Sequence, residues 1–249
     1  MPTYNEADNI GELARRLFAL DTIDLRVLIV DDGSPDGTAD LARRLSDEYG
    51  GRIDVLERPA KLGLGTAYKA GFASALEESP DFVFQMDADL SHPVDQIPSM
   101  LAALSNADVV VGSRYTKGLG KVDAERSWGI HRLLISSLGN LAIRTVAGLR
   151  VRDATSGFKG YRAEALAGLS LQDFRCTGFG FQSEVAFACQ ANGYVVVEHP
   201  FVFSNRMYGT SKMSLAIVIE AIWRLTHMRL RTLLRRPGQP SPREADQPR

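Results

Sequence analysis

The sequence has few cysteines and no excess of either charge. Cys176 and Cys189 are the only two cysteines in 249 residues, so neither a disulfide framework nor a Cys-rich zinc site can be built from them. A reducing compartment is the simpler interpretation. The 29 basic residues nearly balance the 30 acidic ones, and the formal net charge is -1. This balance disfavours a globally basic nucleic-acid binder, and we expect no nucleic-acid partner.

Long hydrophobic runs are also lacking. The longest charge-free stretch, residues 185–197, contains Gln190, Asn192 and Gly193. It is shorter than the roughly 18 residues that a membrane-spanning helix needs. No signal peptide precedes the first motif. With 45% hydrophobic and 24% charged residues, the composition predicts a soluble, cytoplasmic α/β enzyme without a membrane span of its own.

Short apolar runs and helical patterns alternate in the first half of the chain. The apolar runs predict buried strands at residues 25–30, 53–56, 82–86 and 107–111, and helical spacing predicts helices at residues 38–49, 65–76 and 97–104. Strands separated by helices predict a mostly parallel sheet with helices on both faces. Residues 1–6 lead directly into a helix from Asp8, so the strand that should precede this loop is expected to be missing.

The second half is less regular. Residues 132–147 read as a helix and residues 194–198 as a strand. We divide the chain into a catalytic domain at residues 1–214, an amphipathic basic helix at residues 215–236 and a disordered tail at residues 237–249, which holds four prolines. The helix, with Trp223 and several arginines, suits either an anionic membrane surface or docking on the domain.

Acidic residues follow the predicted strands, where ligands of open α/β sheets bind. Asp31 and Asp32 end one strand, Asp87 and Asp89 end another, and Glu6 lies in the first loop. Turn formation explains the first cluster fairly well. It explains Asp87-x-Asp89 less well, because one aspartate suffices for a turn. Two hard carboxylates after a strand favour Mg²⁺ or Mn²⁺ completed by substrate phosphates.

Cationic side chains lie later in the chain, in loops rich in glycine and serine. Arg114 follows the fourth predicted strand, and Arg206 and Lys212 lie within one short stretch. Any one of them is best read as solvated surface charge. Their joint presence favours a diphosphate-bearing donor and a second phosphate, because arginine and lysine are the usual phosphate partners.

Seven motifs in a fixed order carry a resemblance to a known family. They occupy residues 2–6, 31–38, 61–68, 87–93, 112–115, 155–158 and 206–212. This set resembles the polyprenol (dolichol) phosphate mannose synthases, inverting family-2 glycosyltransferases of GT-A fold. The resemblance implies a nucleotide-diphospho-sugar transferase fold and covers roughly residues 2–212.

The resemblance also implies a role for each matching residue. The guanosine pocket would be lined by Pro2, Tyr4, Glu6, Val30 and Asp32. The donor diphosphate and the metal would be held by Asp87, Ala88 and Asp89, with Asp89 the direct ligand. Phosphates would be contacted by Arg114, Arg206 and Lys212. Ser91 stands where some members have a Gln that adds a metal contact, and others carry Ser there.

The implied reaction transfers mannose from GDP-mannose to a polyprenyl phosphate lipid with inversion. The acceptor phosphate is anionic near pH 7 and needs no strong general base, which fits the absence of a convincing His–acid pair. We expect the enzyme to act at the cytoplasmic face of a membrane, bound peripherally or through a separate membrane-anchoring protein.

Other interpretations stay open. The same scaffold could use another nucleotide sugar such as UDP-glucose, or the missing strand could mark an inactive scaffold or lipid-binding subunit. A nucleotidyltransferase fits less well, because no glycine-rich basic loop occurs near the start. His92 could make a helix-entry turn rather than bind a ligand. Phe179 and Phe181 suit the sugar pocket and a packed helix start about equally, and Glu184 merits mutation.

Overall fold

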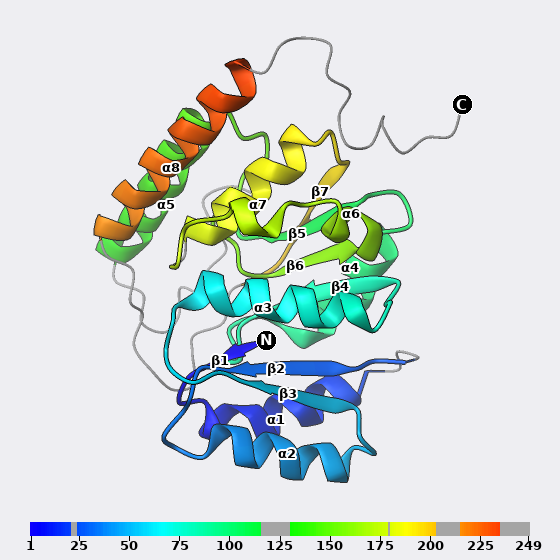
Figure 1. Ribbon diagram of the computed structural model, residues 1–249. Helices are drawn as coiled ribbons and strands as arrows, with labels where there is room; N and C mark the ends of the chain where they lie inside the picture. Colours follow the sequence, from blue (N-terminus) through cyan, green and yellow to red (C-terminus); the bar gives the residue numbers. More distant parts are fainter. Residues whose placement is uncertain (21–23, 116–129, 179, 203–214, 235–249) are drawn as a thin grey trace.

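The computed structural model describes residues 1–20, 24–115, 130–178, 180–202 and 215–234 (Figure 1). Its first half contains a parallel sheet in the order β1-β2-β3. The strands are β1 (Pro2–Thr3), β2 (Val27–Asp31) and β3 (Ile53–Glu57). The accompanying helices are α1 (Ala7–Phe18), α2 (Thr38–Glu48) and α3 (Leu64–Glu77). Apart from β1, these are the alternating elements that the sequence pattern predicts.

The strand expected to be missing at the start is present in the structure as β1. Pro2 pairs with Val30 and Thr3 with Asp31, both in parallel register. The backbone N–H of Asp32 donates to the carbonyl of Thr3 (3.1 Å) and continues the ladder. The expectation of a missing strand was therefore wrong, because two residues are too few to show the alternation that identifies a strand.

A second sheet has the order β4-β6-β5-β7. Its strands are β4 (Phe82–Gln85), β5 (Val109–Ser113), β6 (Lys159–Arg162) and β7 (Val196–Pro200). Strand β7 is parallel to β5, whereas β6 is antiparallel to both of its neighbours. Parallel pairings therefore outnumber antiparallel ones among the described strands. Strand β6 was not predicted, because its sequence contains two cations and a glycine and shows no apolar run.

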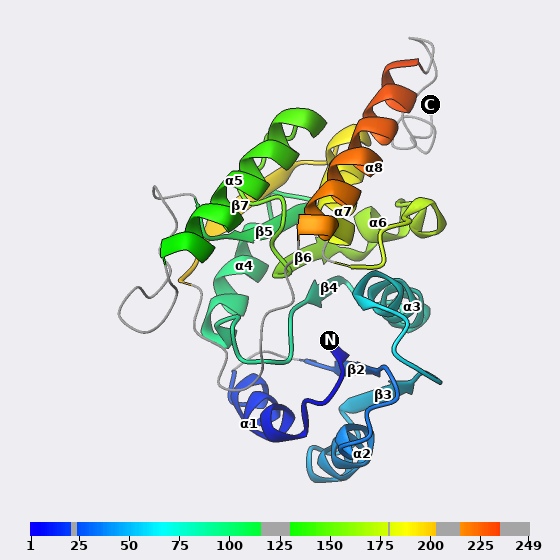
Figure 2. The same cartoon turned by 90° about the vertical axis from the view of Figure 1, so that its left-hand side faces the viewer.

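The remaining helices surround the second sheet. They are α4 (Ile97–Ala103), α5 (Ile130–Ala147), α6 (Ala163–Ala167), α7 (Gly180–Ala191) and α8 (Leu215–Leu234), with 3₁₀ turns at Val94–Gln96 and Leu171–Asp173. Helices α5 and α8 lie side by side in both ribbon views (Figures 1 and 2), and α8 also packs against α7.

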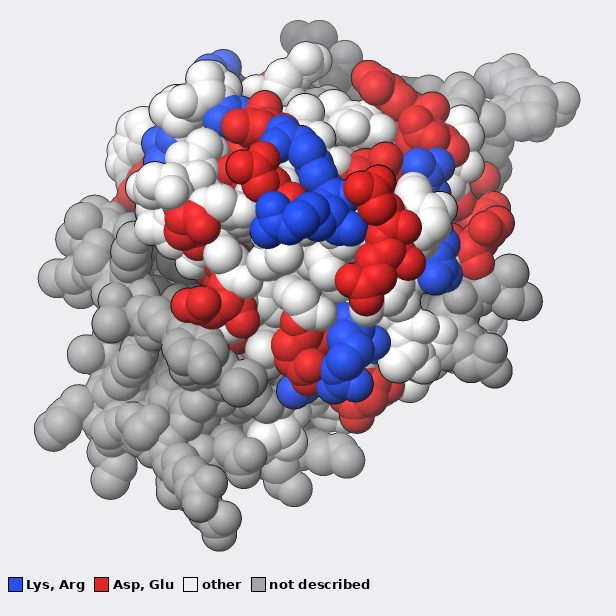
Figure 3. Space-filling view, turned by 90° about the horizontal axis from the view of Figure 1, so that it is seen from below, with Lys and Arg blue, Asp and Glu red and all other residues white. Residues whose placement is uncertain are grey.

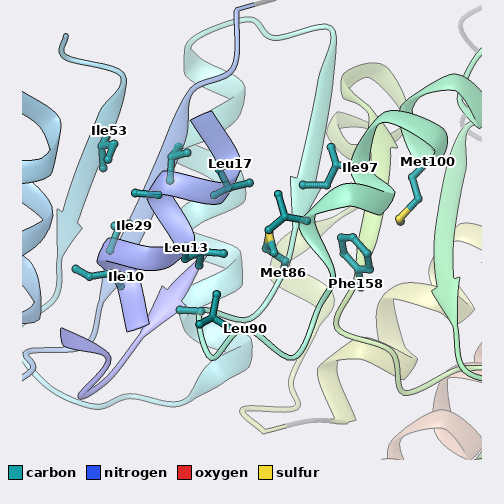
Figure 4. Close-up of a cluster of buried hydrophobic side chains, with 14 of the residues drawn as sticks. Ile10, Leu13, Leu17, Ile29, Ile53, Met86, Leu90, Ile97, Met100 and Phe158 are labelled. Atoms are coloured by element: carbon teal, nitrogen blue, oxygen red, sulfur yellow. The ribbon is translucent and has the colours of Figure 1, made fainter. Parts of the chain in front are cut away.

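Helices cover both faces of the first sheet because successive side chains of β2 point in opposite directions. Ile29 lies in the core cluster that α1 fills, whereas Val30 contacts α3 at Gly71. In Figure 4, Leu13 and Leu17 of α1 lie between two halves of the cluster. One half contains Ile29 of β2 and Ile53 of β3, and the other half lies on the opposite side of α1. That half includes Met86, which follows β4, and residues of α4. One apolar core therefore joins the two sheets.

Helix α8 is docked on the domain through one face. Ala221 and Leu225 are buried in a cluster with residues of α5 and α7. Its other face leaves Trp223 65% exposed and Leu234 80% exposed. One face of this amphipathic helix is therefore docked on the domain, and contact of the other face with a membrane stays a prediction. Among the described residues, no helix is both long enough and apolar enough to cross a bilayer.

The end of the molecule at α1 and α2 carries a mixed charge. Figure 3 shows acidic and basic side chains interspersed over this face. Ion pairs account for part of the mixing, including Arg16 with Glu12 and Arg43 with Asp40. These pairs are solvent-exposed, so each contributes little to stability. The described residues visible on this face therefore form a surface of mixed charge.

Candidate active site

The carboxyl end of β2 begins the site, and the first of its two aspartates is structural. Asp31 is fully buried. Its carboxylate accepts hydrogen bonds from Thr3 Oγ1 (2.9 Å), from the backbone N–H of Ser34 (2.8 Å) and from Ser34 Oγ (2.6 Å). Asp31 thus fixes the end of β1 against the turn after β2, as the turn interpretation predicts.

Asp32, the next residue, forms a buried ion pair that the sequence did not indicate. Its Oδ1 lies 2.7 Å from Arg58 Nη1, and both side chains are less than a tenth exposed. The backbone N–H groups of Leu62 and Gly63 also donate to the carboxylate. Burial raises the pKa of Asp32, while Arg58 and these donors favour the charged form. Arg58 directly follows β3, a position at the same sheet edge that could have identified it.

The loop after β1 is tied to the loop after β2. The N–H of Glu6 donates to Thr38 Oγ1 (3.0 Å), and Glu6 Oε2 accepts from Asn9 Nδ2 (2.6 Å). The ammonium of Lys61 lies 3.5 Å from the centre of the Tyr4 ring, a cation–π contact. Tyr4 and Glu6 are therefore held by contacts with Lys61 and Thr38. Whether they bind a nucleotide base stays a prediction.

The two remaining residues of the predicted pocket lie in the sheet. Pro2 is partly buried in β1 and pairs with Val30. Val30 is only 2% exposed, and its side chain contacts the backbone of α3 at Gly71. Val30 is therefore part of the paired sheet, and its contact with a nucleotide stays a prediction.

Asp87, Ala88 and Asp89 follow β4 and are rigidly held. Asp87 Oδ1 accepts a hydrogen bond from the hydroxyl of Tyr68 (3.2 Å), and Asp89 Oδ1 accepts one from the N–H of Ser91 (3.1 Å). Leu90 has a φ of +62°, a left-handed conformation that is costly for a branched side chain. Such strain at an acidic turn is typical of a functional loop.

His92 is a structural residue of this turn. Its Nδ1 accepts the backbone N–H of Asp87 (3.0 Å), so the neutral ring carries its proton on Nε2. The ring stacks on Phe158 and meets the edge of Phe201. Burial lowers the pKa of His92. The helix-entry interpretation of this histidine fits the structure, and the metal-ligand interpretation does not.

The surroundings of Asp87 and Asp89 fit a divalent cation. A Cβ on Gly157 would lie 3.3 Å from Asp87 Oδ1, so the glycine leaves room beside that oxygen. Ser91 Oγ is buried and has no hydrogen-bond partner within the part of the chain that the structure describes. No group of three His, Cys, Asp or Glu side chains converges among the described residues. A cation held here by two carboxylates would take its other ligands from substrate phosphates and water.

Helix α3 connects the two acidic clusters. Thr66 Oγ1 accepts a hydrogen bond from Arg58 Nη2 (2.7 Å), the guanidinium that pairs with Asp32. Two residues later, Tyr68 reaches Asp87. The first turn of one helix therefore positions both halves of the site.

Arg114 is held by a partner that the sequence reasoning missed. Its Nε and Nη2 atoms donate to the two oxygens of Asp153 (2.7 and 2.8 Å), and Nη2 also donates to Thr155 Oγ1 (2.9 Å). Burial opposes the charge of Asp153, but Arg114 outweighs it and lowers the pKa of that carboxyl. The guanidinium is thus fixed in orientation beside the acidic clusters, and its phosphate contact stays a prediction. Arg206 and Lys212 lie outside the described residues.

The segment before and within α7 contributes to the core rather than to an open pocket. Phe181 is fully buried and stacks on Tyr68, with ring centres 5.7 Å apart. Glu184 is also fully buried and accepts two backbone N–H groups. Phe179 lies outside the described residues. Of the two interpretations of Phe181, packing at a helix start is the one that the structure supports.

Comparisons with known proteins agree with this arrangement. Residues 1–169 match the family model described as glycosyl transferase family 2. An undecaprenyl-phosphate mannosyltransferase of Micrococcus luteus is 41% identical over 91% of this chain and 90% of its own length. A polyprenol monophosphomannose synthase of Mycolicibacterium smegmatis is 37% identical over 95% and 88%, respectively.

A solved structure shares the fold at low sequence identity. It is a mannosyltransferase from Pyrobaculum calidifontis in complex with GDP-Man and Mn²⁺, with a TM-score of 0.57, 18% identity and coverage of 98% of this chain and 65% of that one. The architecture described above is therefore the GT-A fold. Because the family model matches more than half of the chain and these relatives match nearly all of it, the chain belongs to glycosyl transferase family 2 and is a glycosyltransferase.

Proposed function

We propose that this glycosyltransferase moves mannose from GDP-mannose to a polyprenyl monophosphate, with inversion at the anomeric carbon. The observation that carries the proposal is that one helix connects two acidic groups, each of which follows a strand. The Asp32–Arg58 pair follows strands of the first sheet, the Asp87-x-Asp89 turn follows β4 of the second, and α3 contacts both. The two relatives described above, and a dolichol-phosphate mannosyltransferase of Pyrococcus furiosus, are 36–41% identical over at least 88% of the chain.

The donor would span the two halves of the site. Tyr4, Glu6 and Asp32 would hold the guanosine, and Asp87 and Asp89 would hold Mg²⁺ or Mn²⁺ together with the diphosphate. A bound cation would neutralise charge that develops on the leaving diphosphate. Mn²⁺ is bound in the Pyrobaculum calidifontis structure.

The acceptor requires charge compensation rather than a base. An oxygen of the lipid phosphate attacks the anomeric carbon as the bond from that carbon to the GDP oxygen breaks. The attacking oxygen is already anionic, so no proton has to be removed. The difficulty is repulsion between two phosphates, which Arg114, Arg206 and Lys212 would offset. Asp153 keeps the Arg114 guanidinium in place for this role.

The lipid would be met at a membrane surface. Exposed apolar side chains lie on both members of the α5–α8 pair: Leu138, Leu141, Trp223, Leu230 and Leu234. Helix α8 carries the exposed Arg231 as well as Trp223, and aromatic and basic residues together suit an anionic interface. We infer peripheral attachment at the cytoplasmic face, with a separate anchoring protein as the alternative.

The deciding experiment is a transfer assay with radiolabelled donors and a polyprenyl phosphate in detergent or vesicles. We expect transfer from GDP-mannose in the presence of Mg²⁺ or Mn²⁺, and a loss of roughly 100-fold or more in kcat for Asp89→Asn. Asp95→Asn, an exposed aspartate in the same region, is the matched control. Faster transfer from UDP-glucose than from GDP-mannose would show that the proposed donor is wrong. No transfer from either donor would favour an inactive scaffold.

A further inference from the structure

Glu184 is a fully buried carboxylate that neither half of the site uses. It lies on α7, and its Oε2 accepts the backbone N–H groups of Arg175 (3.0 Å) and Cys176 (2.9 Å). A buried carboxylate is costly unless hydrogen bonds and a cation compensate its charge. Glu184 therefore holds residues 175–176 in one place, and it needs a cation to do so.

The cation comes from helix α8. Arg224 Nε lies 3.4 Å from Glu184 Oε1, and the Arg224 side chain is only 18% exposed. The other arginine that ties α8 to the domain, Arg229, donates to the carbonyls of Thr145 and Val146 at the end of α5. Arg224 is therefore the α8 residue that acts on Glu184, and Arg229 offers a matched comparison.

The segment that Glu184 holds lies directly against the start of α3. The N–H of Gly65 donates to the carbonyl of Thr177 (2.8 Å). A Cβ on Gly65 would lie only 2.2 Å from the carbonyl oxygen of Cys176. No side chain separates the two backbones, so a shift of residues 175–177 must move residues 63–65 as well.

Residues 61–66, which we call the donor loop, comprise the loop before α3 and the first three residues of that helix, and they make the contacts that organise the donor half of the site. Leu62 and Gly63 donate backbone N–H groups to Asp32. At the two ends of the loop, Lys61 lies over the Tyr4 ring and Thr66 accepts from Arg58. The position of the donor loop therefore decides how Asp32 and Arg58 are presented.

We propose that Glu184, held by Arg224, is a positioning residue that sets the donor loop through residues 175–177 and thereby sets the affinity for the nucleoside diphosphate. Neither residue touches the donor in this scheme. The inference rests on the proposed function for the identity of the nucleotide, and its test measures nucleotide binding rather than transfer.

The experiment is calorimetric titration of the full chain with GDP and Mn²⁺, without lipid. We expect Glu184→Gln to raise the Kd for GDP about tenfold, because its amide cannot accept from the backbone N–H groups and from Arg224 together. Arg224→Gln should raise it about threefold to fivefold, whereas Arg224→Lys should remain near wild type. Arg229→Gln, which removes a different α8 contact, should leave the Kd unchanged.

Two further measurements separate positioning from a general loss of structure. Thermal unfolding identifies variants that bind poorly because they are unfolded, and Arg224→Gln, partly exposed, should remain folded if Glu184→Gln does not. The KM for the lipid acceptor should change less than the Kd for GDP. Folded Arg224→Gln with an unchanged Kd, or with an equal loss in Arg229→Gln, overturns the inference. Wild type that binds neither GDP nor UDP overturns the proposed function as well.

Discussion

Lys159 on β6 offers a test of the buried polar layer beneath the site. The side chain is 1% exposed, and its ammonium donates to the carbonyl of Ser156 and to Gln182 Oε1 (2.7 Å). Burial lowers its pKa from 10.5 to about 7. Between those values the unfolded chain binds more protons than the folded one, so the stability of the folded state must rise with pH.

The size of the effect follows from the two pKa values. A difference of one pKa unit corresponds to about 1.4 kcal/mol. A folded-state pKa of about 7 against 10.5 in the unfolded chain predicts a gain of about 1.5 kcal/mol in the free energy of unfolding from pH 7 to pH 8.5. Lys159→Met removes the group, and with it this part of the slope, whatever the variant's stability at pH 7.

The assay is urea unfolding of both proteins at several pH values from 7 to 8.5. All other titrating groups are common to both, so the difference between the two slopes isolates Lys159. Lys69→Met is the control, because Lys69 also donates to a backbone carbonyl, that of Phe174 (3.2 Å), but is only partly buried. Parallel curves for wild type and Lys159→Met would refute the reasoning.

Three further predictions concern the site and the α8 surface. Asp153→Asn removes the charge that holds Arg114 and should lower the free energy of unfolding by about 3 kcal/mol, measured by urea unfolding; a loss below about 1 kcal/mol would contradict a buried ion pair. Gly157→Ala places a methyl group 3.3 Å from Asp87 Oδ1 and should weaken Mn²⁺ binding several-fold in a direct titration, with unchanged affinity counting against the cation assignment. Trp223→Ser removes an aromatic side chain that is 65% exposed and should reduce sedimentation with anionic vesicles while leaving GDP binding unchanged; equal sedimentation would place the membrane contact elsewhere.

The parts of the fold that follow from local pattern were predictable. The apolar runs at residues 25–30 and 107–111 correspond to β2 and β5. These runs are apolar at nearly every position because both faces of the strands are buried. Strand β6 carries Lys159 inside the protein, and only tertiary hydrogen bonds make that tolerable. No sequence pattern encodes such compensation, so β6 could not be found.

The site residues, like the fold, were predictable only in part. Asp32, Asp87 and Asp89 could each be placed directly after a strand, because ligands of open α/β sheets bind beyond the carboxyl ends of the strands. Their partners could not be assigned. Asp153 lies 39 residues from Arg114, and nothing in the spacing pairs the two. Arg58 is the one of these partners that the sequence could have indicated, because it directly follows a predicted strand.

The first turn of α3 has a consequence for selectivity. Thr66 and Tyr68 belong to one rigid helix, yet one contacts the partner of Asp32 and the other contacts Asp87. The end of the site proposed to recognise the base and the end proposed to hold the leaving group are therefore mechanically linked. A donor whose base displaces Arg58 would also disturb the carboxylates near the bond that breaks. A nucleotide sugar with a different base should accordingly be turned over more slowly as well as bound more weakly.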